Sequence, residues 1–222
     1  MVDGATPVVP VWRNELGGLT FRIGDDRYLK WAPTESGITF ADEIARLQWA
    51  SAYIVVPRVL DAGATDDGEW LLTAAIPGEN AVSERWKREP RTAARAIGAG
   101  LRAMHDMLPV LECPFDWSIA ERRKRLTDPA APLPAEPPND QLVVCHGDPC
   151  APNTLLDDNG GVAGHVDLGR LGVADLWADL AVATYNLGRN YGDGFERDLL
   201  DAYGIDPDEE RTAFYRALWD AT

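Results

Sequence analysis

Two short polar motifs, each directly after an apolar run, constrain this chain more than any other feature. The first is His146-Gly147-Asp148, which follows Val143-Val144-Cys145 and precedes Asn153. The second is Asp167-Leu168-Gly169, which follows another apolar, strand-like run. Either motif alone is short enough to be an ordinary surface turn or strand end. Their order, their spacing and their shared place behind a predicted buried strand favour one joint site.

The residue types in these motifs suit phosphoryl transfer from a nucleotide to a hydroxyl group. One carboxylate accepts the proton of the attacking hydroxyl, while an amide oxygen and a second carboxylate hold the magnesium that neutralises the phosphates. In the protein-kinase pattern these groups are the catalytic-loop Asp, the Asn five positions later and the Asp before a Gly. The sequence therefore predicts Asp148 as the catalytic residue and Asn153 and Asp167 as Mg²⁺ ligands.

The same residues carry a resemblance to a known family. His146-Gly-Asp-x-Cys-x-Pro-Asn153 and Asp167-Leu-Gly-Arg-Leu-Gly-x-Ala-Asp175-x-x-x-Asp179-Leu-Ala181 resemble the aminoglycoside phosphotransferases, in particular the branch acting on a 3'- or 3''-hydroxyl. The Cys and Pro within the first motif, and the Arg after the second, distinguish that branch from protein kinases and choline kinases. The resemblance runs from about Trp12 to the C-terminus and is sharpest between residues 143 and 185.

Near the N-terminus, Gly17-Gly18 separates two strand-like segments. Because glycine allows close approach of the backbone, this turn can lay its N–H groups over nucleotide phosphates. An ordinary hairpin turn is the alternative, since the full glycine-rich kinase motif is absent. Its position before the next strand leaves the two interpretations about equally supported.

Lys30 lies on the alternating segment Arg27–Trp31, where the kinase pattern has its phosphate-binding lysine. Apolar residues at helical spacing predict a helix around Phe40–Trp49, which carries Glu43. We expect an ion pair between Lys30 and Glu43. The alternative is that both are solvated surface residues, and Glu35 and Asp42 are nearby competitors for the lysine.

Two further strands are predicted at Val55–Leu60 and Trp70–Thr73. The second runs toward Pro77-Gly78, where proline and glycine should end it. In the resembled family this hinge holds the adenine through backbone groups. By position, the resemblance implies Ala74 and Ile76 for that role.

The C-terminal half is predicted to be mostly helical. Apolar spacing predicts a buried helix over Arg91–Met107, on which His105 is interpreted as structural. The charge run Arg122–Arg125 is predicted to be a solvated helix face. The segment 128–140 is proline-rich and is predicted to be an irregular loop, and a helix start is predicted at Asp206-Pro207. Asp179 is expected to tether the catalytic loop rather than bind metal.

Composition limits the functional classes. The net charge of −15 and the pI near 4.5 disfavour nucleic-acid and anionic-lipid partners and favour a cationic one, although solubility alone can explain such acidity. No apolar run is long enough to span a membrane, and no signal peptide is visible. Three cysteines without paired spacing favour a cytoplasmic setting.

The resemblance implies an α+β, two-lobed, protein-kinase-like fold. A small N-lobe at residues 1–76 would have an antiparallel β-sheet with one helix, and the C-lobe at 77–222 would carry the catalytic loop, metal site and substrate site. ATP or GTP and Mg²⁺ are the expected cofactors. Arg170 and Asp220 are the substrate-binding candidates, and a monomer or weak dimer is expected.

Three functional hypotheses follow. The first is transfer of the γ-phosphoryl group to a hydroxyl of an aminoglycoside, giving antibiotic resistance. The second is a kinase of another small hydroxyl metabolite, since fold does not fix substrate. It is favoured by a short, proline-rich segment at 115–142 and by the absence of paired acids with an aromatic residue at the C-terminus. The third is a non-catalytic nucleotide-binding regulator, which the complete Asp148, Asn153 and Asp167 set disfavours.

Overall fold

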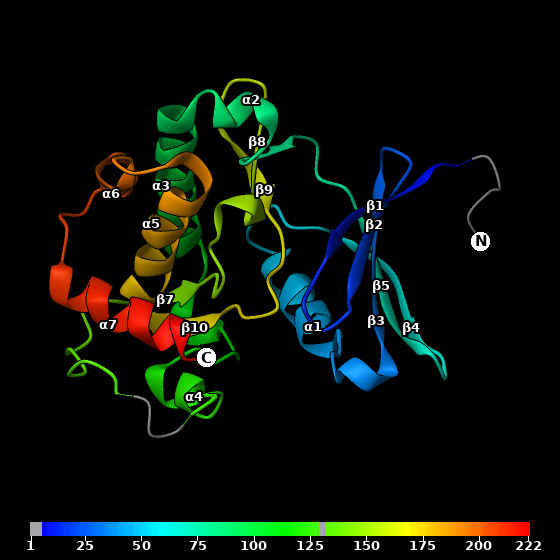
Figure 1. Ribbon diagram of the computed structural model, residues 1–222, viewed down its shortest axis with the longest axis horizontal. Coiled ribbons are helices and arrows are strands. Elements are labelled where there is room, and N and C mark those ends of the chain that lie inside the picture. The colour runs from blue at the N-terminus through cyan, green and yellow to red at the C-terminus, as the bar shows by residue number, and fades with distance from the viewer. Residues whose placement is uncertain (1–5, 129–131) are drawn as a thin grey trace. The chain divides into compact units, whose positions relative to one another are not determined.

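The computed structural model describes residues 6–128 and 132–222, and Figure 1 shows the course of the chain. The chain divides into two compact units, an N-terminal unit that ends at Pro77 and a C-terminal unit over Gly78–Thr222. The first is built on an antiparallel sheet, and the second is mostly helical. Among the described residues, no helix has both the length and the apolar character needed to cross a bilayer.

The sheet of the N-terminal unit has five antiparallel strands in the order β1-β2-β3-β5-β4 (Figure 1). These are β1 (Val8–Arg13), β2 (Leu19–Ile23), β3 (Arg27–Pro33), β4 (Val59–Ala64) and β5 (Gly68–Ala74). The strand predicted at Val55–Leu60 exists, but its predicted bounds are wrong, because β4 begins only at Val59 and runs to Ala64. Pro57 has no N–H group to give to a strand ladder, and Val55 is exposed.

Helix α1 (Ala41–Ala50) follows β3 after a 3-10 turn at Thr34–Ser36. Leu47 and Ala50 are buried on one face of this helix, as its apolar spacing predicts. Glu43 is buried as well, and buried carboxylates are usually paired with another group. The predicted helix is therefore confirmed, and its buried acid faces the interior of this unit.

Long helices form the framework of the C-terminal unit (Figure 1). They are α3 (Pro90–Met107), α5 (Trp177–Tyr191), α6 (Glu196–Tyr203) and α7 (Glu209–Asp220), with the short α2 (Glu84–Lys87) and α4 (Ile119–Arg123). The helix predicted over Arg91–Met107 is confirmed, with proline in its first turn. The predicted helix start at Asp206 is wrong, because Asp208 is the N-cap and accepts the N–H of Arg211 at 2.9 Å.

Two small sheets position the loops between these helices. Strand β7 (Leu142–Cys145) pairs with β10 (Gly172–Asp175), and β8 (Thr154–Leu156) lies between β6 (Glu79–Asn80) and β9 (Val162–His165). A 3-10 turn at Ala151–Asn153 leads into β8, and another lies at Val110–Glu112. Both sequence motifs therefore leave the carboxyl end of a short buried strand.

The prediction of a solvated face at Arg122–Arg125 is wrong for its first residue. Arg122 has a side chain with no exposed surface, and its guanidinium carbon lies 5.3 Å from the ring centroid of Trp117. Within the described part of the chain, none of its three nitrogens has a hydrogen-bond partner. Contact with the face of the indole ring provides part of the stabilisation of this buried guanidinium. Of the proline-rich segment, residues 132–140 form no helix or strand, and residues 129–131 lie outside the described residues.

Candidate active site

Asp179 of α5 fixes the start of the first motif. Its carboxylate accepts the N–H of His146 at 2.6 Å and the N–H of Gly147 at 3.0 Å. Gly147 has φ +83°, and a Cβ atom there would overlap the carbonyl group of Arg170. Only glycine suits this turn, because it combines left-handed backbone with close packing. The expectation that Asp179 tethers the catalytic loop is confirmed.

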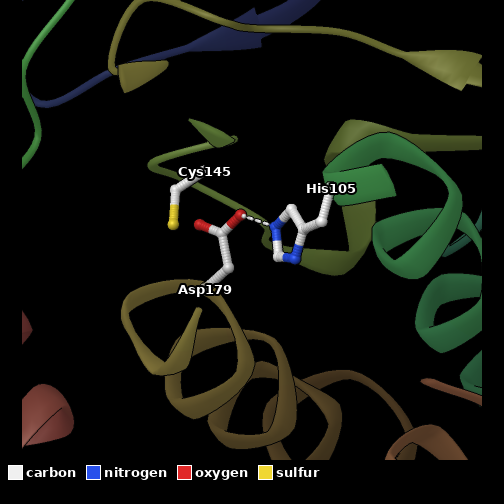
Figure 2. A group of neighbouring side chains, drawn as sticks. All are labelled: His105, Cys145 and Asp179. Atoms are coloured by element: carbon white, nitrogen blue, oxygen red, sulfur yellow. Dashed lines mark hydrogen bonds and ion pairs between the residues drawn. The ribbon is translucent and has the colours of Figure 1, made fainter. Parts of the chain in front are cut away.

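His105 of α3 supports Asp179 from the other side, as Figure 2 shows. Its Nε2 lies 3.0 Å from Asp179 Oδ2, and its Nδ1 lies 2.8 Å from the hydroxyl of Tyr203. Burial alone raises the pKa of the Asp179 carboxyl, but the hydrogen bond and charge of His105, with the loop N–H groups, hold that pKa below its usual range. Asp179 is therefore a buried carboxylate stabilised by its neighbours.

His105, Cys145 and Asp179 present potential metal-ligand atoms within 4.8 Å of one another (Figure 2). Their polar atoms already have protein partners. The Cys145 thiol donates to the carbonyl of Asp175 at 3.4 Å, and burial raises the pKa of this thiol well above its usual value. A protonated thiol is a poor metal ligand. We interpret the cluster as a hydrogen-bonded tether.

Asp148 and Asn153 lie at the two ends of one short loop. The Nδ2 group of Asn153 donates to the main-chain oxygen of Asp148 at 2.9 Å. This bond leaves the amide oxygen of Asn153 available to a cation. The Oδ1 atom of Asp148 is buried and, among the described residues, accepts no hydrogen bond. Such an atom suits a proton acceptor that is completed by its substrate.

Asp167 reaches the same loop through the main chain. The N–H of Val166 donates to the carbonyl of Asn153 at 3.0 Å, directly before Asp167, and β8 pairs with β9 through Thr154 and His165. Asp167 has φ +64°, a left-handed conformation that is uncommon outside glycine. Amide and carboxylate oxygens, which Asn153 and Asp167 carry, are the kind of ligand that Mg²⁺ prefers.

The buried side chains of His146 and His165 pack against each other next to the two motifs. Both are buried, and their rings meet edge to face with centroids 5.8 Å apart. The Nδ1 atom of His146 accepts the N–H of Asp148 at 3.3 Å. Burial, and then the nearby His146, lower the pKa of His165 to about 3, so His165 is neutral at physiological pH. His165 therefore packs beside the loops without adding charge.

Lys30 and Glu43 form the expected ion pair in the N-terminal unit. The Lys30 Nζ lies 2.7 Å from Oε1 and 2.9 Å from Oε2 of Glu43. The neighbouring Asp42 is instead 3.4 Å from Arg46, one turn along α1. Glu43 is buried, whereas the Lys30 side chain is 27% exposed. The amine is therefore held in place by Glu43, while part of the Lys30 side chain remains accessible.

The glycine turn and the hinge candidates have defined backbone roles. The N–H of Gly17 donates to the carbonyl of Asn14 at 3.2 Å, and the N–H of Gly18 donates to Asn14 Oδ1 at 2.7 Å. Both glycine N–H groups are thus used within the turn, which agrees with the ordinary hairpin alternative and not with the prediction that these groups bind phosphate. Ala74 donates its N–H to the carbonyl of Arg58 at 2.9 Å, so this N–H is already used within the protein. Ile76 follows on the half-buried segment after β5.

The substrate-binding candidates lie in the C-terminal unit. The guanidinium carbon of Arg170 lies 5.8 Å from the ring centroid of Trp117 and 5.1 Å from that of Trp219. Arg170 therefore links the segment after the second motif to helix α7. Asp220, the last residue of α7, is exposed.

Two asparagines that contact the catalytic loop were not anticipated from the sequence. Asn186 of α5 accepts the N–H of Ala151, and Asn80 of β6 donates to the carbonyl of Pro152. One signal was available for the first, because Asn186 lies two helical turns after Asp179 and so on the same face of α5. Asn80 is 72 residues from its partner, and no local pattern connects them.

Comparison with known proteins gives consistent matches. The family model described as "Phosphotransferase enzyme family" matches residues 14–132 and 124–215. The aminoglycoside 3'-phosphotransferase of Streptomyces fradiae is 36% identical to this chain over 84% of the chain and 81% of that protein. The streptomycin 3''-kinase of Streptomyces griseus is 35% identical over 94% of the chain and 89% of that protein.

Solved structures agree. An aminoglycoside phosphotransferase from Streptomyces rimosus has a TM-score of 0.78 and 32% identity, covering 97% of this chain and 92% of that one. A complex of that protein with ADP and streptomycin has a TM-score of 0.74. With the antiparallel sheet and the helical unit described above, these likenesses confirm the predicted kinase-like α+β fold.

Proposed function

This chain belongs to the phosphotransferase enzyme family, and from that premise we propose that it is an aminoglycoside O-phosphotransferase. It moves the γ-phosphoryl group of a nucleoside triphosphate to a hydroxyl of the antibiotic and so gives resistance. The curated relatives named above support a 3'- or 3''-hydroxyl as the acceptor position. ADP in the Streptomyces rimosus complex supports ATP as the phosphoryl donor. GDP complexes of a more distant structural neighbour support GTP as the alternative donor.

The observation that carries the proposal is the arrangement of the two motifs. Asn153 binds the main chain of Asp148 through its side chain and the main chain of Val166 through its carbonyl. One residue thereby joins the loop of the catalytic carboxylate to the segment of Asp167. This convergence of a base and two oxygen ligands is what in-line phosphoryl transfer requires.

The roles of the individual residues follow from their chemistry. Asp148 orients the acceptor hydroxyl and takes its proton. The acceptor oxygen then bonds to the γ-phosphorus, and the bond between this phosphorus and the bridging oxygen of the β-phosphate breaks. Asn153 and Asp167 hold Mg²⁺, which neutralises phosphate charge when bound. Lys30, held by Glu43, binds the phosphates. Backbone groups around Ala74 and Ile76 hold the base.

Acceptor selection is assigned to the acidic surface of the chain. With a net charge of −15, long-range attraction favours a polycationic antibiotic. Asp220 binds an amino group of the acceptor, and Arg170 orders the segment behind it. We propose a cytoplasmic protein that acts as a monomer or weak dimer and has neither nucleic-acid nor membrane partners.

One observation favours the second candidate, a kinase of a different small hydroxyl compound. The guanidinium carbons of Arg122, Arg125 and Arg170 lie 5.3, 5.1 and 5.8 Å from the ring centroid of Trp117. This concentration of positive charge beside the second motif suits an acceptor with fewer amino groups.

A coupled ADP-release assay with ATP, Mg²⁺ and paired acceptors tests the proposal. Each pair has an aminoglycoside and its analogue lacking only the 3'- or the 3''-hydroxyl. We expect release with the intact acceptor, none with the matching deoxy analogue, and loss of release in Asp148→Ala. Asp158→Ala, an exposed acid of the β8–β9 turn, serves as control and should retain activity. ADP binding without release for any aminoglycoside would favour the second candidate.

A further inference from the structure

The Ala151–Pro152 segment of the catalytic loop is held from two sides by asparagine side chains. Asn186 Oδ1 accepts the N–H of Ala151 at 2.8 Å, and Asn80 Nδ2 donates to the carbonyl of Pro152 at 2.6 Å. Ala151 is buried, so its N–H needs a protein partner. Proline has no N–H of its own to hold this turn. The two amides therefore supply bonds that the short 3-10 turn lacks.

The orientation of each amide is set by a further bond. Asn186 Oδ1 also accepts Nδ2 of Asn190 at 2.7 Å, so two donors converge on this oxygen. Asn80 Oδ1 accepts the N–H of Val82 at 2.8 Å, which directs its Nδ2 toward Pro152. Asn186 thus acts as an acceptor toward the loop, whereas Asn80 acts as a donor.

The two asparagines are also connected to each other through the fold. The hydroxyl of Tyr191, the last residue of α5, donates to the carbonyl of Ala81, which follows Asn80 in the chain. Helix α5 therefore holds the loop directly through Asn186 and supports the strand that bears Asn80. A shift of either asparagine would move the segment that leads into Asn153.

We propose that Asn186 and Asn80 are positioning residues that set Asn153 for binding the metal–nucleotide pair, an inference that rests on the proposed function. The N–H of Asn153 donates to the main-chain carbonyl of Cys150 at 2.8 Å, so Asn153 closes the turn that contains Ala151 and Pro152. Rotation of this turn redirects the Asn153 amide oxygen. Residues that orient a metal ligand in this way typically change metal affinity by about 10- to 100-fold when replaced.

The opposite hydrogen-bond roles make a sharp test, because replacement by Asp should be tolerated at position 186 and should weaken the turn at position 80. Asn186→Asp keeps an acceptor for Ala151 and for Asn190. Asn80→Asp removes the donor and sets a carboxylate oxygen against the carbonyl of Pro152. Asn186→Leu has a similar size and no acceptor. Thr184→Val is the control on the same helix, since its buried hydroxyl donates to the carbonyl of Leu180 at 2.7 Å and accepts from Arg216 at 3.0 Å, neither of which belongs to the loop.

The first measurement is hydrogen exchange at the Ala151 amide in the metal-free protein. We expect exchange at least about 10-fold faster in Asn186→Leu, and unchanged within about threefold in Asn186→Asp and Thr184→Val. Asn80→Asp should also speed it, because the turn loses its second support. Equal protection of the Ala151 amide in Asn186→Leu and in the wild type would show that Asn186 does not hold the turn, whatever the activity of the enzyme.

The second measurement is calorimetric binding of ADP across a Mg²⁺ titration. Asn186→Leu and Asn80→Asp should need about 10-fold more Mg²⁺ for half-maximal binding, with metal-free ADP binding unchanged. Faster exchange without this change would refute the link to Asn153. If ADP binding to the wild type is independent of Mg²⁺, the proposed metal site is refuted. The exchange experiment still decides whether the two asparagines hold the turn at Ala151 and Pro152.

Discussion

Replacing Asp179 with asparagine tests the tether at the base of the catalytic loop. The carboxylate accepts two loop N–H groups and bonds His105. An amide has one acceptor oxygen, so at least one buried donor would face an NH₂ group instead. Hydrogen bonds to a charged group are worth about 1.5–3 kcal/mol, and a stranded buried donor costs about 1–3 kcal/mol. We therefore expect Asp179→Asn to lose roughly 3–5 kcal/mol of unfolding free energy.

The pH dependence of that loss has a defined sign. The pKa of Asp179 is lower in the folded protein than the unfolded value, which is about 3.9. The unfolded chain then binds more protons at this site, so stability rises with pH in this window. The contribution is fully present above the unfolded pKa and is lost as pH falls through the folded one. The deficit of Asp179→Asn should accordingly be largest near pH 7 and shrink below about pH 4.

Urea unfolding followed by tryptophan fluorescence at pH 7 and pH 3.5 measures both effects. Asp175→Asn is the matched control, because Asp175 also accepts two main-chain N–H groups, that of Trp177 at 2.9 Å and that of Asp140 at 2.5 Å, near the start of the same helix. Burial raises the pKa of Asp175, so its charge adds less, and we expect a loss of about 1–2 kcal/mol from the donor left without an acceptor. If the two variants differ by less than about 1 kcal/mol at pH 7, the charged tether is refuted.

Three further predictions concern single side chains. Lys30→Met should lower kcat/KM for ATP by about 100-fold, because a charge on the phosphates is lost, and steady-state kinetics would show no change if the lysine were only structural. Gly147→Ala should destabilise the C-terminal unit by about 2–3 kcal/mol in urea, since a methyl group meets the carbonyl of Arg170 at positive φ, and an unchanged midpoint would contradict this. Arg122→Met should raise the unfolding free energy by about 1–4 kcal/mol, because the buried cation over Trp117 has no hydrogen-bond partner among the described residues; a decrease would show that the charge is compensated.

The sequence was most informative where chemistry or periodicity is local. The two motifs predicted the segment in which Asp148, Asn153 and Asp167 are brought together, because each motif is a strand end followed by a polar turn. Helical spacing predicted α1 and α3. The ion pair between Lys30 and Glu43 could be predicted because the kinase pattern supplies both positions.

The parts that sequence could not predict depend on contacts between distant segments. The burial of Arg122 is decided by the indole of Trp117 and the packing around it, and a run of four basic residues gives no sign of that. Asn80 meets Pro152 across 72 residues through the β6–β8 pairing. The start of β4 was missed because Val55 and Val56 look like strand residues, whereas Pro57 prevents the ladder from extending back to them.

Helix α5 connects stability with chemistry in this protein. It binds the loop before Asp148 through Asp179 and the loop before Asn153 through Asn186, two turns further along the same face. Its rise of about 1.5 Å per residue sets a separation of roughly 10 Å between those two anchors. A change that bends or frays α5 should therefore disturb the spacing between base and metal ligand before it unfolds the unit. Selection for antibiotic turnover would then act on the rigidity of α5 as well as on the motif residues.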